Sequence, residues 1–364
     1  MISISDMYEE LRAHLDTLPV GYPSTESRVE IEILRELFEP IEAQIAMKLS
    51  FIPQKVKQIY RKLSNEDISL ERLKDILQQM YSKGTIMRIK NKDETLYSNT
   101  MFVVGMYEYQ LGRLTASLVS KIFQYFEEGY FEKEFNFTSI PQLRTIPTNE
   151  AITPDMTIAT YDQLKTFIEN ASTIAIMDCI CRKAHDLLND PCKKTHLRET
   201  CMTFGEAART FYEKGVARFI TKEEAYELAR IFEKEGLVPS PSNSKKPFVV
   251  CNCCGCCCEV ISNQKRFKNP SQFFATNFYA EIHIDLCTSC GLCQERCNLD
   301  AITINNANSH IDLGSCIGCG LCISSCPSNA IQLRKKEEEI IPPENTLQTY
   351  KNILHKKNKL KNKS

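Results

Sequence analysis

The chemistry available to this chain is concentrated in its cysteines. The sequence of 364 residues contains 18 cysteines, and none of them precedes Cys179. Eight of them form two runs of the same spacing, which are Cys287, Cys290, Cys293 and Cys297, then Cys316, Cys319, Cys322 and Cys326. Cysteine thiolates bind zinc and the iron of iron–sulfur clusters. The repeat therefore predicts a pair of metal centres in the last third of the chain.

The spacing within each run favours iron–sulfur clusters over zinc. Each run has the pattern C-x2-C-x2-C-x3-C, in which the fourth cysteine binds the neighbouring cluster. One [4Fe–4S] cluster is therefore expected on Cys287, Cys290, Cys293 and Cys326, and the other on Cys297, Cys316, Cys319 and Cys322. Zinc sites do not need this spacing. Short apolar segments at 301–304 and 330–333 follow the runs and predict a repeated βαβ unit.

Residues from about 280 to 335 resemble the dicluster ferredoxin family. The resemblance rests on the two cysteine runs and on Gly291, Gly318 and Gly320, which permit tight turns close to a cluster. It implies two [4Fe–4S] clusters and electron transfer. Asn298 departs from the family pattern, because the family has a proline there, as Pro327 has after the second run. Proline shapes the backbone without binding metal, so we expect both clusters to form.

Ten further cysteines lie in the middle of the chain, within residues 179–258. They are Cys179, Cys181, Cys192 and Cys201, followed by a dense block of Cys251, Cys253, Cys254, Cys256, Cys257 and Cys258. The first four are expected to form one site for a third [4Fe–4S] cluster or a zinc ion. Adjacent side chains in the block point in different directions, so the block is expected to serve two sites or one larger cluster. The prediction is one or two additional iron–sulfur clusters or a zinc.

Composition favours metal binding over a disulfide framework. Disulfide-rich proteins belong to oxidising compartments, and residues 1–16 are acidic and amphipathic, unlike a secretory leader. No apolar run reaches the ~18 residues that a membrane-spanning helix requires. The formal net charge is −1, which gives no overall field that would attract nucleic acid or a membrane. A cytoplasmic protein with reduced thiols is expected.

The elements before the first cysteine are predicted to be mostly helical, in a domain over residues 1–145. Apolar residues recur at helical spacing in 31–38, 41–49, 56–63 and 69–81, with Ser69 as an N-cap and Gly84 as a C-cap. Residues 85–97 predict a β-hairpin. This helix–glycine–hairpin order resembles a winged helix-turn-helix domain over about 28–100. A long aromatic-rich helix is predicted over 101–135.

Composition divides the chain after residue 145 into three further segments. A mixed domain is predicted over 146–245, with a strand at 174–177 and a helix from Thr221 to Gly236. A proline- and serine-rich linker at 239–244 leads to residues 246–335, which hold the cysteine block and the ferredoxin-like domain. The lysine-rich tail 336–364 is expected to be disordered. The predicted fold class is α+β with several domains.

The order of these parts resembles a family of uncharacterised multi-cluster 4Fe–4S binding proteins of anaerobic bacteria and archaea. The order is a winged-helix-like region, Cys-x-Cys-Arg at 179–182, the CNCCGCCC block at 251–258 and the dicluster region. Residues 21–23 and 30–31 also fit the resemblance. It implies cluster binding and electron transfer, without a defined reaction.

Three functions are compatible with this pattern. The first is an electron-transfer protein that exchanges electrons with an oxidoreductase partner. The second is a redox-sensing DNA-binding regulator, in which Arg72, Lys74, Arg88 and Lys90 would face the nucleic acid. The third is a catalytic subunit, because Cys-Cys-Gly segments loosely resemble the cysteine-rich domains of heterodisulfide reductase subunits. No catalytic residue is predicted, so an electron carrier is favoured over a stand-alone enzyme.

Overall fold

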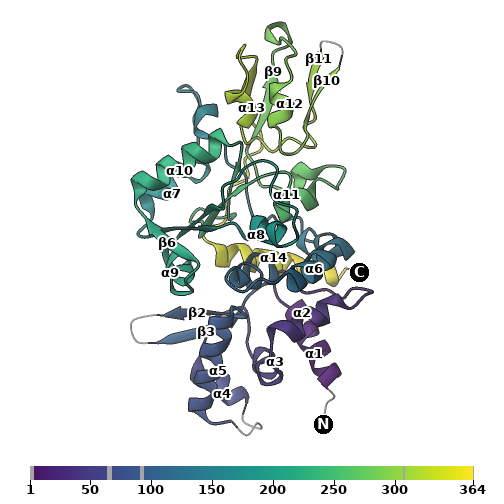
Figure 1. The fold of residues 1–364 in the computed structure, drawn as a ribbon, viewed down its shortest axis with the longest axis vertical. Coiled ribbons are helices and arrows are strands. Elements are labelled where there is room, and N and C mark those ends of the chain that lie inside the picture. The colour runs from purple at the N-terminus through teal and green to yellow at the C-terminus, as the bar shows by residue number, and fades with distance from the viewer. Residues whose placement is uncertain (1–3, 64–67, 91–93, 306–307, 364) are drawn as a thin grey trace. The chain divides into compact units, whose positions relative to one another are not determined.

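The structure, a computed structural model, describes residues 4–63, 68–90, 94–305 and 308–363. It divides into two compact units (Figure 1). The first contains the chain up to Thr138 together with the segment from Tyr350 onward, and the second is Ser139–Thr349. Both contain helices and strands, which confirms the predicted mixture of the two. Within the described residues, every helix is too short or too polar to cross a membrane.

The first unit begins with three helices that follow the apolar spacing of the sequence. They are α1 (Ile4–Asp16), α2 (Val29–Leu37) and α3 (Pro40–Ala46). Pro40 occupies the first turn of α3, where its missing N–H is not needed. The apolar side chains Leu11, Ile33 and Leu34 are fully buried. The helix predicted over 41–49 is therefore confirmed, and it spans Pro40–Ala46.

The next segment combines two helices with a small antiparallel sheet. Its elements are β1 (Gln54–Lys55), α4 (Val56–Lys62), α5 (Leu70–Lys83), β2 (Ile86–Lys90) and β3 (Thr95–Asn99), with strand order β1-β3-β2. Ser69 accepts a hydrogen bond from the backbone N–H of Arg72, and Gly84 ends α5 with φ 80°. Both predicted caps are confirmed. The hairpin predicted over 85–97 is confirmed by β2 and β3, and its residues 91–93 lie outside the described part of the chain.

Residues 101–135 do not form the single long helix that the sequence predicts. Instead α6 (Ala116–Tyr125) is followed by a wider helical segment, Phe126–Phe135, that is interrupted at Gly129 with φ 115°. The aromatic side chains turn inward and pack on one another. The ring centroids of Tyr22 and Phe102 are 5.2 Å apart, and those of Phe131 and Phe135 are 4.8 Å apart. Burial of these rings outweighs the continuity of the helix.

The lysine-rich tail contains a helix, so the expectation of disorder is wrong. Helix α14 spans Thr346–Lys361. Within the first unit its residues Tyr350 and Ile353 are buried, and the Nζ of Lys357 lies 2.5 Å from a carboxylate oxygen of Glu134. Composition alone missed these contacts, because a few buried side chains in a charged segment are enough to fix a helix.

The second unit is built on a five-stranded antiparallel sheet of order β6-β4-β5-β8-β7. The strands are β4 (Ile174–Asp178), β5 (Glu199–Phe204), β6 (Ala217–Ile220), β7 (Val238–Pro241) and β8 (Val249–Cys253). The prolines of β7 stand on an edge strand, where a missing N–H is tolerated. Residues 239–244, which the sequence predicts to be a linker, are buried. The linker prediction is therefore wrong.

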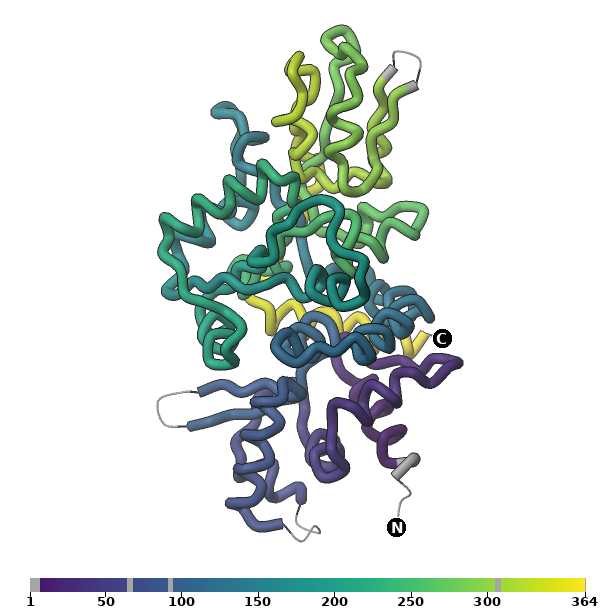
Figure 2. The backbone as a smooth tube through the Cα atoms, viewed as in Figure 1, coloured from purple at the N-terminus to yellow at the C-terminus, as the bar shows by residue number. Residues whose placement is uncertain are grey.

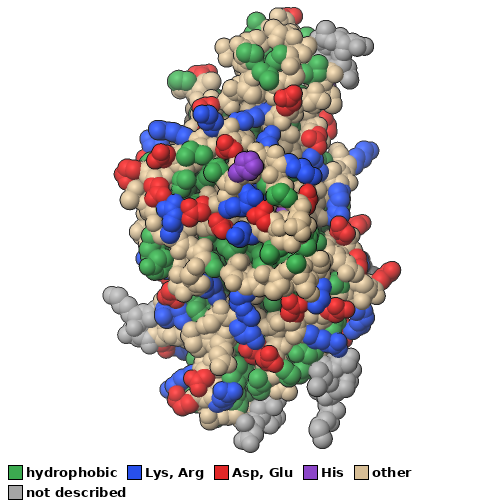
Figure 3. Space-filling model, viewed as in Figure 1, with side chains coloured by type: hydrophobic (Ala, Val, Ile, Leu, Met, Phe, Trp, Pro, Cys, Tyr) green, Lys and Arg blue, Asp and Glu red, His purple; other side chains and the backbone are tan. Residues whose placement is uncertain are grey.

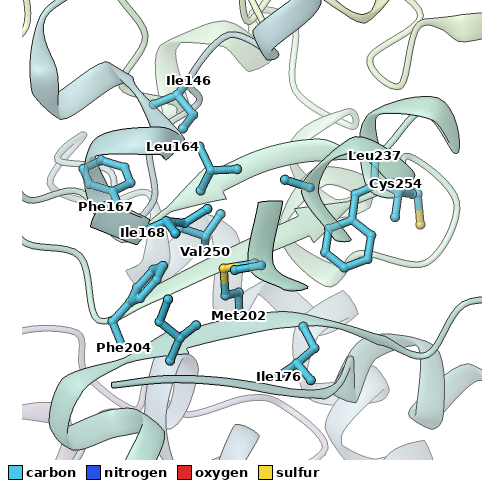
Figure 4. Close-up of a cluster of buried hydrophobic side chains, with 14 of the residues drawn as sticks. Ile146, Leu164, Phe167, Ile168, Ile176, Met202, Phe204, Leu237, Val250 and Cys254 are labelled. Atoms are coloured by element: carbon cyan, nitrogen blue, oxygen red, sulfur yellow. The ribbon is translucent and has the colours of Figure 1, made fainter. Parts of the chain in front are cut away.

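One face of this sheet carries the main core. Helices α7 (Leu164–Asn170) and α10 (Lys222–Lys234) supply apolar side chains to it. Figure 4 shows Phe167 and Ile168 of α7 gathered with Met202 and Val250 of the strands. Thr221 accepts the N–H of Glu224 and caps α10, which begins where the sequence predicts. The opposite face carries the alternate residues of the strands.

Short helices connect the strands. They are α8 (Ile180–Leu187), α9 (Gly205–Glu213) and α11 (Glu259–Gln264). Helix α9 contacts β4, β5 and β6. Helices α8 and α11 begin immediately after Cys179 and Cys258, so each of these cysteines is at a helix N-terminus.

The C-terminal part of the second unit consists of two similar halves. One half is β9 (Phe278–Ile282), α12 (Leu292–Arg296) and β10 (Ile302–Asn305), and the other is β11 (Asn308–Ile311), α13 (Leu321–Ser324) and β12 (Ile331–Lys335). Strand β9 pairs with β12 and β10 pairs with β11, both antiparallel, while α12 contacts α13. Figure 2 shows these segments in green to yellow-green at one end of the second unit.

Candidate metal centres

The two halves of the C-terminal region enclose two cavities lined by cysteines. One cavity is lined by Cys297, Cys316, Cys319 and Cys322, with apolar Ile302, Ile311 and Leu321 beside them. The other is lined by Cys287, Cys290, Cys293 and Cys326, with Ile282, Ile304 and Ile331. The last cysteine of each run therefore lies beside the first three of the other run. This exchange follows from the antiparallel pairing of β9 with β12 and of β10 with β11.

Backbone groups around these cavities suit anionic sulfur. The N–H groups of Ala280, Ala301 and Ala330 donate to the Sγ atoms of Cys316, Cys297 and Cys326, at 3.4, 3.3 and 3.3 Å. Hydrogen bonds to sulfur are among the levers that set the potential of a cluster.

Glycine is required where the chain passes closest to other backbone. A Cβ on Gly318 would lie 2.2 Å from the carbonyl oxygen of Phe278, and Gly318 has φ 62°.

Burial raises the pKa of Cys322, so this thiol gives up its proton readily only when a cation binds it. The donor set, its polarity and its tight turns all fit iron–sulfur clusters.

Six of the other cysteines form a closed ring on the second face of the five-stranded sheet. The pKa of each thiol is shifted by its two neighbours in the order Cys179, Cys181, Cys258, Cys253, Cys251, Cys201 and back to Cys179, so the six thiols lie next to one another in this order. Cys201 and Cys251 are paired across β5 and β8, and Cys253 follows two residues later on the same face. Strand pairing and strand periodicity thus bring half of the ring together.

The remaining four middle cysteines form a separate group. Cys254, Cys256 and Cys257 belong to the loop after β8, and Cys192 comes from the segment after α8. The Sγ of Cys192 lies 3.7 Å from that of Cys254 and 3.6 Å from that of Cys256. Cys254 lies 3.2 Å from Cys257 and 3.6 Å from Cys256, and all four Sγ atoms are within 4.8 Å of one another.

This grouping corrects one sequence expectation. Cys192 was expected to share a site with Cys179, Cys181 and Cys201, but it lies with the loop cysteines instead. The reason is that α8 carries the chain away from the sheet before Cys192 is reached. Asn189, with φ 59°, turns the chain after that helix. The dense block supplies thiols to both groups, because its first part continues strand β8 and its later part belongs to the following loop.

A buried arginine lies between the two thiol groups. The guanidinium of Arg182 is almost fully buried and donates to the Sγ of Cys254 at 3.4 Å, to the carbonyl of Asn252 at 3.1 Å and to the hydroxyl of Thr200. Desolvation acts to lower the pKa of Arg182, but the nearby Cys179 and Cys254 hold it above its ordinary value. A buried cation needs anionic neighbours, and sulfur supplies them here.

The cysteine loop is joined directly to the ferredoxin-like region by Asn298. The side-chain oxygen of Asn298 accepts the N–H of Gly255 at 2.9 Å, and its amide donates to the carbonyl of Gly236 at 2.8 Å. Asn298 follows Cys297, and Gly255 stands between Cys254 and Cys256. A Cβ on Gly255 would lie 2.2 Å from the backbone oxygen of Asn298. The residue that departs from the ferredoxin pattern is therefore a structural link.

The sequence signalled some of these features and missed others. In the sequence, Arg182 stands out only as the end of the Cys-x-Cys-Arg segment, and Asn298 only as a departure from the family pattern, so the contacts of both come from the structure. A polar residue where a family has proline was the available signal for Asn298. The ring nitrogens of His185, at the end of α8, lie 3.4 Å from Asp190 and 3.3 Å from Glu259.

Comparison with known protein families matches one segment of the chain. A family model described as a 4Fe-4S binding domain matches residues 310–332, which contain the whole second cysteine run. No curated protein and no solved structure matches the chain. The matched segment and the wealth of cysteines identify an iron–sulfur protein.

Proposed function

We propose that the protein is an electron carrier with two [4Fe–4S] clusters in its C-terminal region. One cluster would be held by Cys287, Cys290, Cys293 and Cys326, and the other by Cys297, Cys316, Cys319 and Cys322. The observation that supports this most strongly is the pair of cavities, each lined by four cysteines from both runs. When bound, such clusters supply reversible one-electron transfer.

Other residues around the two cavities surround the cysteines and donate hydrogen bonds to them. Apolar side chains line both cavities, and Cys293, Cys316 and Cys322 are buried beside them. The backbone N–H groups of Ala280, Ala301 and Ala330 donate to three of the eight cysteine sulfurs. The two halves share ligands, which keeps the two cavities close together. An electron can therefore cross between them without leaving the protein.

One end of this region is suited to meet a redox partner. Cys290 is exposed. Around it, Ile284, Leu286 and Leu292 are large apolar side chains that also remain exposed. Transient electron-transfer complexes use small contact areas with an apolar centre. We propose an oxidoreductase as this partner, and the first run as its contact surface.

The six-thiol ring is the candidate for a further polynuclear iron–sulfur cluster. Its thiols come from β5, β8, α8 and the start of α11, and they are too many for a single zinc ion, which takes four ligands. A cluster there would extend the electron path into the middle of the second unit. The family of multi-cluster proteins that the whole sequence resembles is consistent with this arrangement.

The first unit is proposed to be a winged-helix-like docking module for protein. In the alternative function, DNA binding, α5 and the β2–β3 hairpin would carry free basic side chains. Lys74 instead lies 2.8 Å from Glu71, and the guanidinium of Arg88 lies over the ring of Tyr81. Figure 3 shows acidic and basic side chains interspersed on the face that it draws. DNA binders concentrate basic residues on one surface, so the protein partner is favoured.

The proposal is tested by counting iron and sulfide in the whole protein purified without oxygen. Replacing Cys316 with serine is expected to remove about four irons and four sulfides per chain and the signal of one reduced cluster in electron paramagnetic resonance. Ser315→Ala, at the half-buried preceding position, is the matched control and should change neither. An unchanged iron content in Cys316→Ser would refute the assignment.

A further inference from the structure

The loop cysteines differ from the other cysteines in how closely they approach one another. Within the described residues, Cys192, Cys254, Cys256 and Cys257 are the one set of three or more potential ligand side chains whose ligand atoms all lie within 4.8 Å. The eight cysteines around the two C-terminal cavities are spaced more widely than this. The same is true of the six-thiol ring, in which no three sulfur atoms all lie within 4.8 Å of one another.

That spacing distinguishes one metal ion from a cluster. Four thiolates on one tetrahedral ion, with bonds of about 2.3 Å, have sulfur–sulfur edges of about 3.8 Å. The four measured edges, from Cys192 to Cys254 and Cys256 and from Cys254 to Cys256 and Cys257, run from 3.2 to 3.7 Å. A cubane separates its thiolates much more, because each binds a different iron at a different corner.

We propose that Cys192, Cys254, Cys256 and Cys257 bind a single divalent metal ion, zinc or iron, in a tetrahedral tetrathiolate site. This site is distinct from the iron–sulfur centres of the proposed function and does not depend on them.

The surroundings suit the charge of such a site. A divalent ion with four thiolates has a net charge of −2, and the buried guanidinium of Arg182 donates to Cys254 from the protein side. The backbone N–H groups of Thr195 and Lys193 act to lower the pKa of Cys192 and of Cys256, which favours the thiolate form of both. The Nε of Arg182 has no hydrogen-bond partner although it is buried. The guanidinium and the backbone N–H groups therefore both favour the thiolate form of these cysteines, which is the form that binds a metal ion.

The position in the chain indicates what this metal ion does. Cys192 is 62 residues from Cys254, so the ion would join two segments that are distant in the sequence. Cross-linking a long loop restricts the unfolded chain and stabilises the folded one. The loop that is held in this way also carries Gly255, which is bonded to Asn298 beside Cys297. We therefore infer a structural ion that fixes the loop against the ferredoxin-like region.

The test compares metal and sulfide in the full-length protein. The double variant Cys256→Ser, Cys257→Ser is expected to lose one zinc or iron ion per chain and no acid-labile sulfide. Cys316→Ser is the comparison, since its loss, if the proposed function is right, includes sulfide. If the double variant loses iron and sulfide together, the site is a cluster and the proposal fails. If its metal content is unchanged, no ion binds there and the proposal also fails.

A second measurement uses a variant that is expected to fold, so that loss of metal through misfolding cannot be mistaken for loss of a ligand. Cys256→His keeps four ligands, because Cys256 is exposed and has room for an imidazole. We expect it to retain the metal ion. After replacement of the ion by Co²⁺, wild-type protein should show the absorption of tetrahedral cobalt with four sulfurs, and this variant that of three sulfurs and one nitrogen. Identical cobalt spectra for the two proteins would overturn the assignment.

Discussion

A substitution of Asn298 should selectively weaken the contact between the cysteine loop and the ferredoxin-like region. The substitution Asn298→Ala removes the hydrogen bonds to Gly255 and Gly236, of 2.9 and 2.8 Å, and leaves the backbone otherwise free to keep its course. Asn298 is 6% exposed. Water therefore does not readily replace the two lost partners.

The magnitude follows from those two bonds. Each intramolecular hydrogen bond contributes about 0.5–1.5 kcal/mol net, and a buried group left without a partner costs about 1–3 kcal/mol. We expect Asn298→Ala to lower the free energy of unfolding of the second unit by about 2–4 kcal/mol. Asn298→Asp should be destabilising as well, because a carboxylate cannot donate to the carbonyl of Gly236.

The assay is guanidinium unfolding of the anaerobic protein, followed by both circular dichroism and the visible absorption of the clusters. The matched control is Gln294→Ala, an exposed position on α12 in the same region, which should change the unfolding midpoint little. A midpoint for Asn298→Ala within the error of Gln294→Ala, at equal dependence on denaturant, would refute the structural role given to Asn298.

Three further results are expected. Lys357→Met leaves the carboxylate of Glu134 buried without its cation, and should destabilise the first unit by about 3–5 kcal/mol, measured by thermal unfolding. Burial lowers the pKa of His14, so the unfolded chain takes up a proton near pH 6.5 before the folded one does. The first unit should therefore lose stability as the pH falls below about 6.5; His14→Gln should remove this dependence, measured by amide hydrogen exchange in α1. Arg182→Lys loses the forked geometry that reaches several acceptors at once, and should speed release of the tetrathiolate metal to a chelator roughly tenfold to a hundredfold. The exposed Arg218→Lys is its control and should leave the rate unchanged.

The sequence by itself determined the features that depend on neighbours along the chain. The caps at Ser69, Gly84 and Thr221 were predictable, because each is set by one side chain and the backbone within a turn of it. The C-x2-C-x2-C-x3-C runs indicated an iron–sulfur protein, since ligand spacing within a short loop is a local property. The long helix predicted over 101–135 was wrong because burial of aromatic rings competed with local helical preference.

Tertiary structure decided which distant residues meet. The division of ten cysteines into a ring of six and a group of four depends on the pairing of Cys201 with Cys251 and on the path of the chain from α8 to Cys192. Strand register and helix direction are fixed by packing of the whole core. No spacing in the sequence encodes them, and for the same physical reason the contacts of Arg182 and Asn298 became visible only in three dimensions.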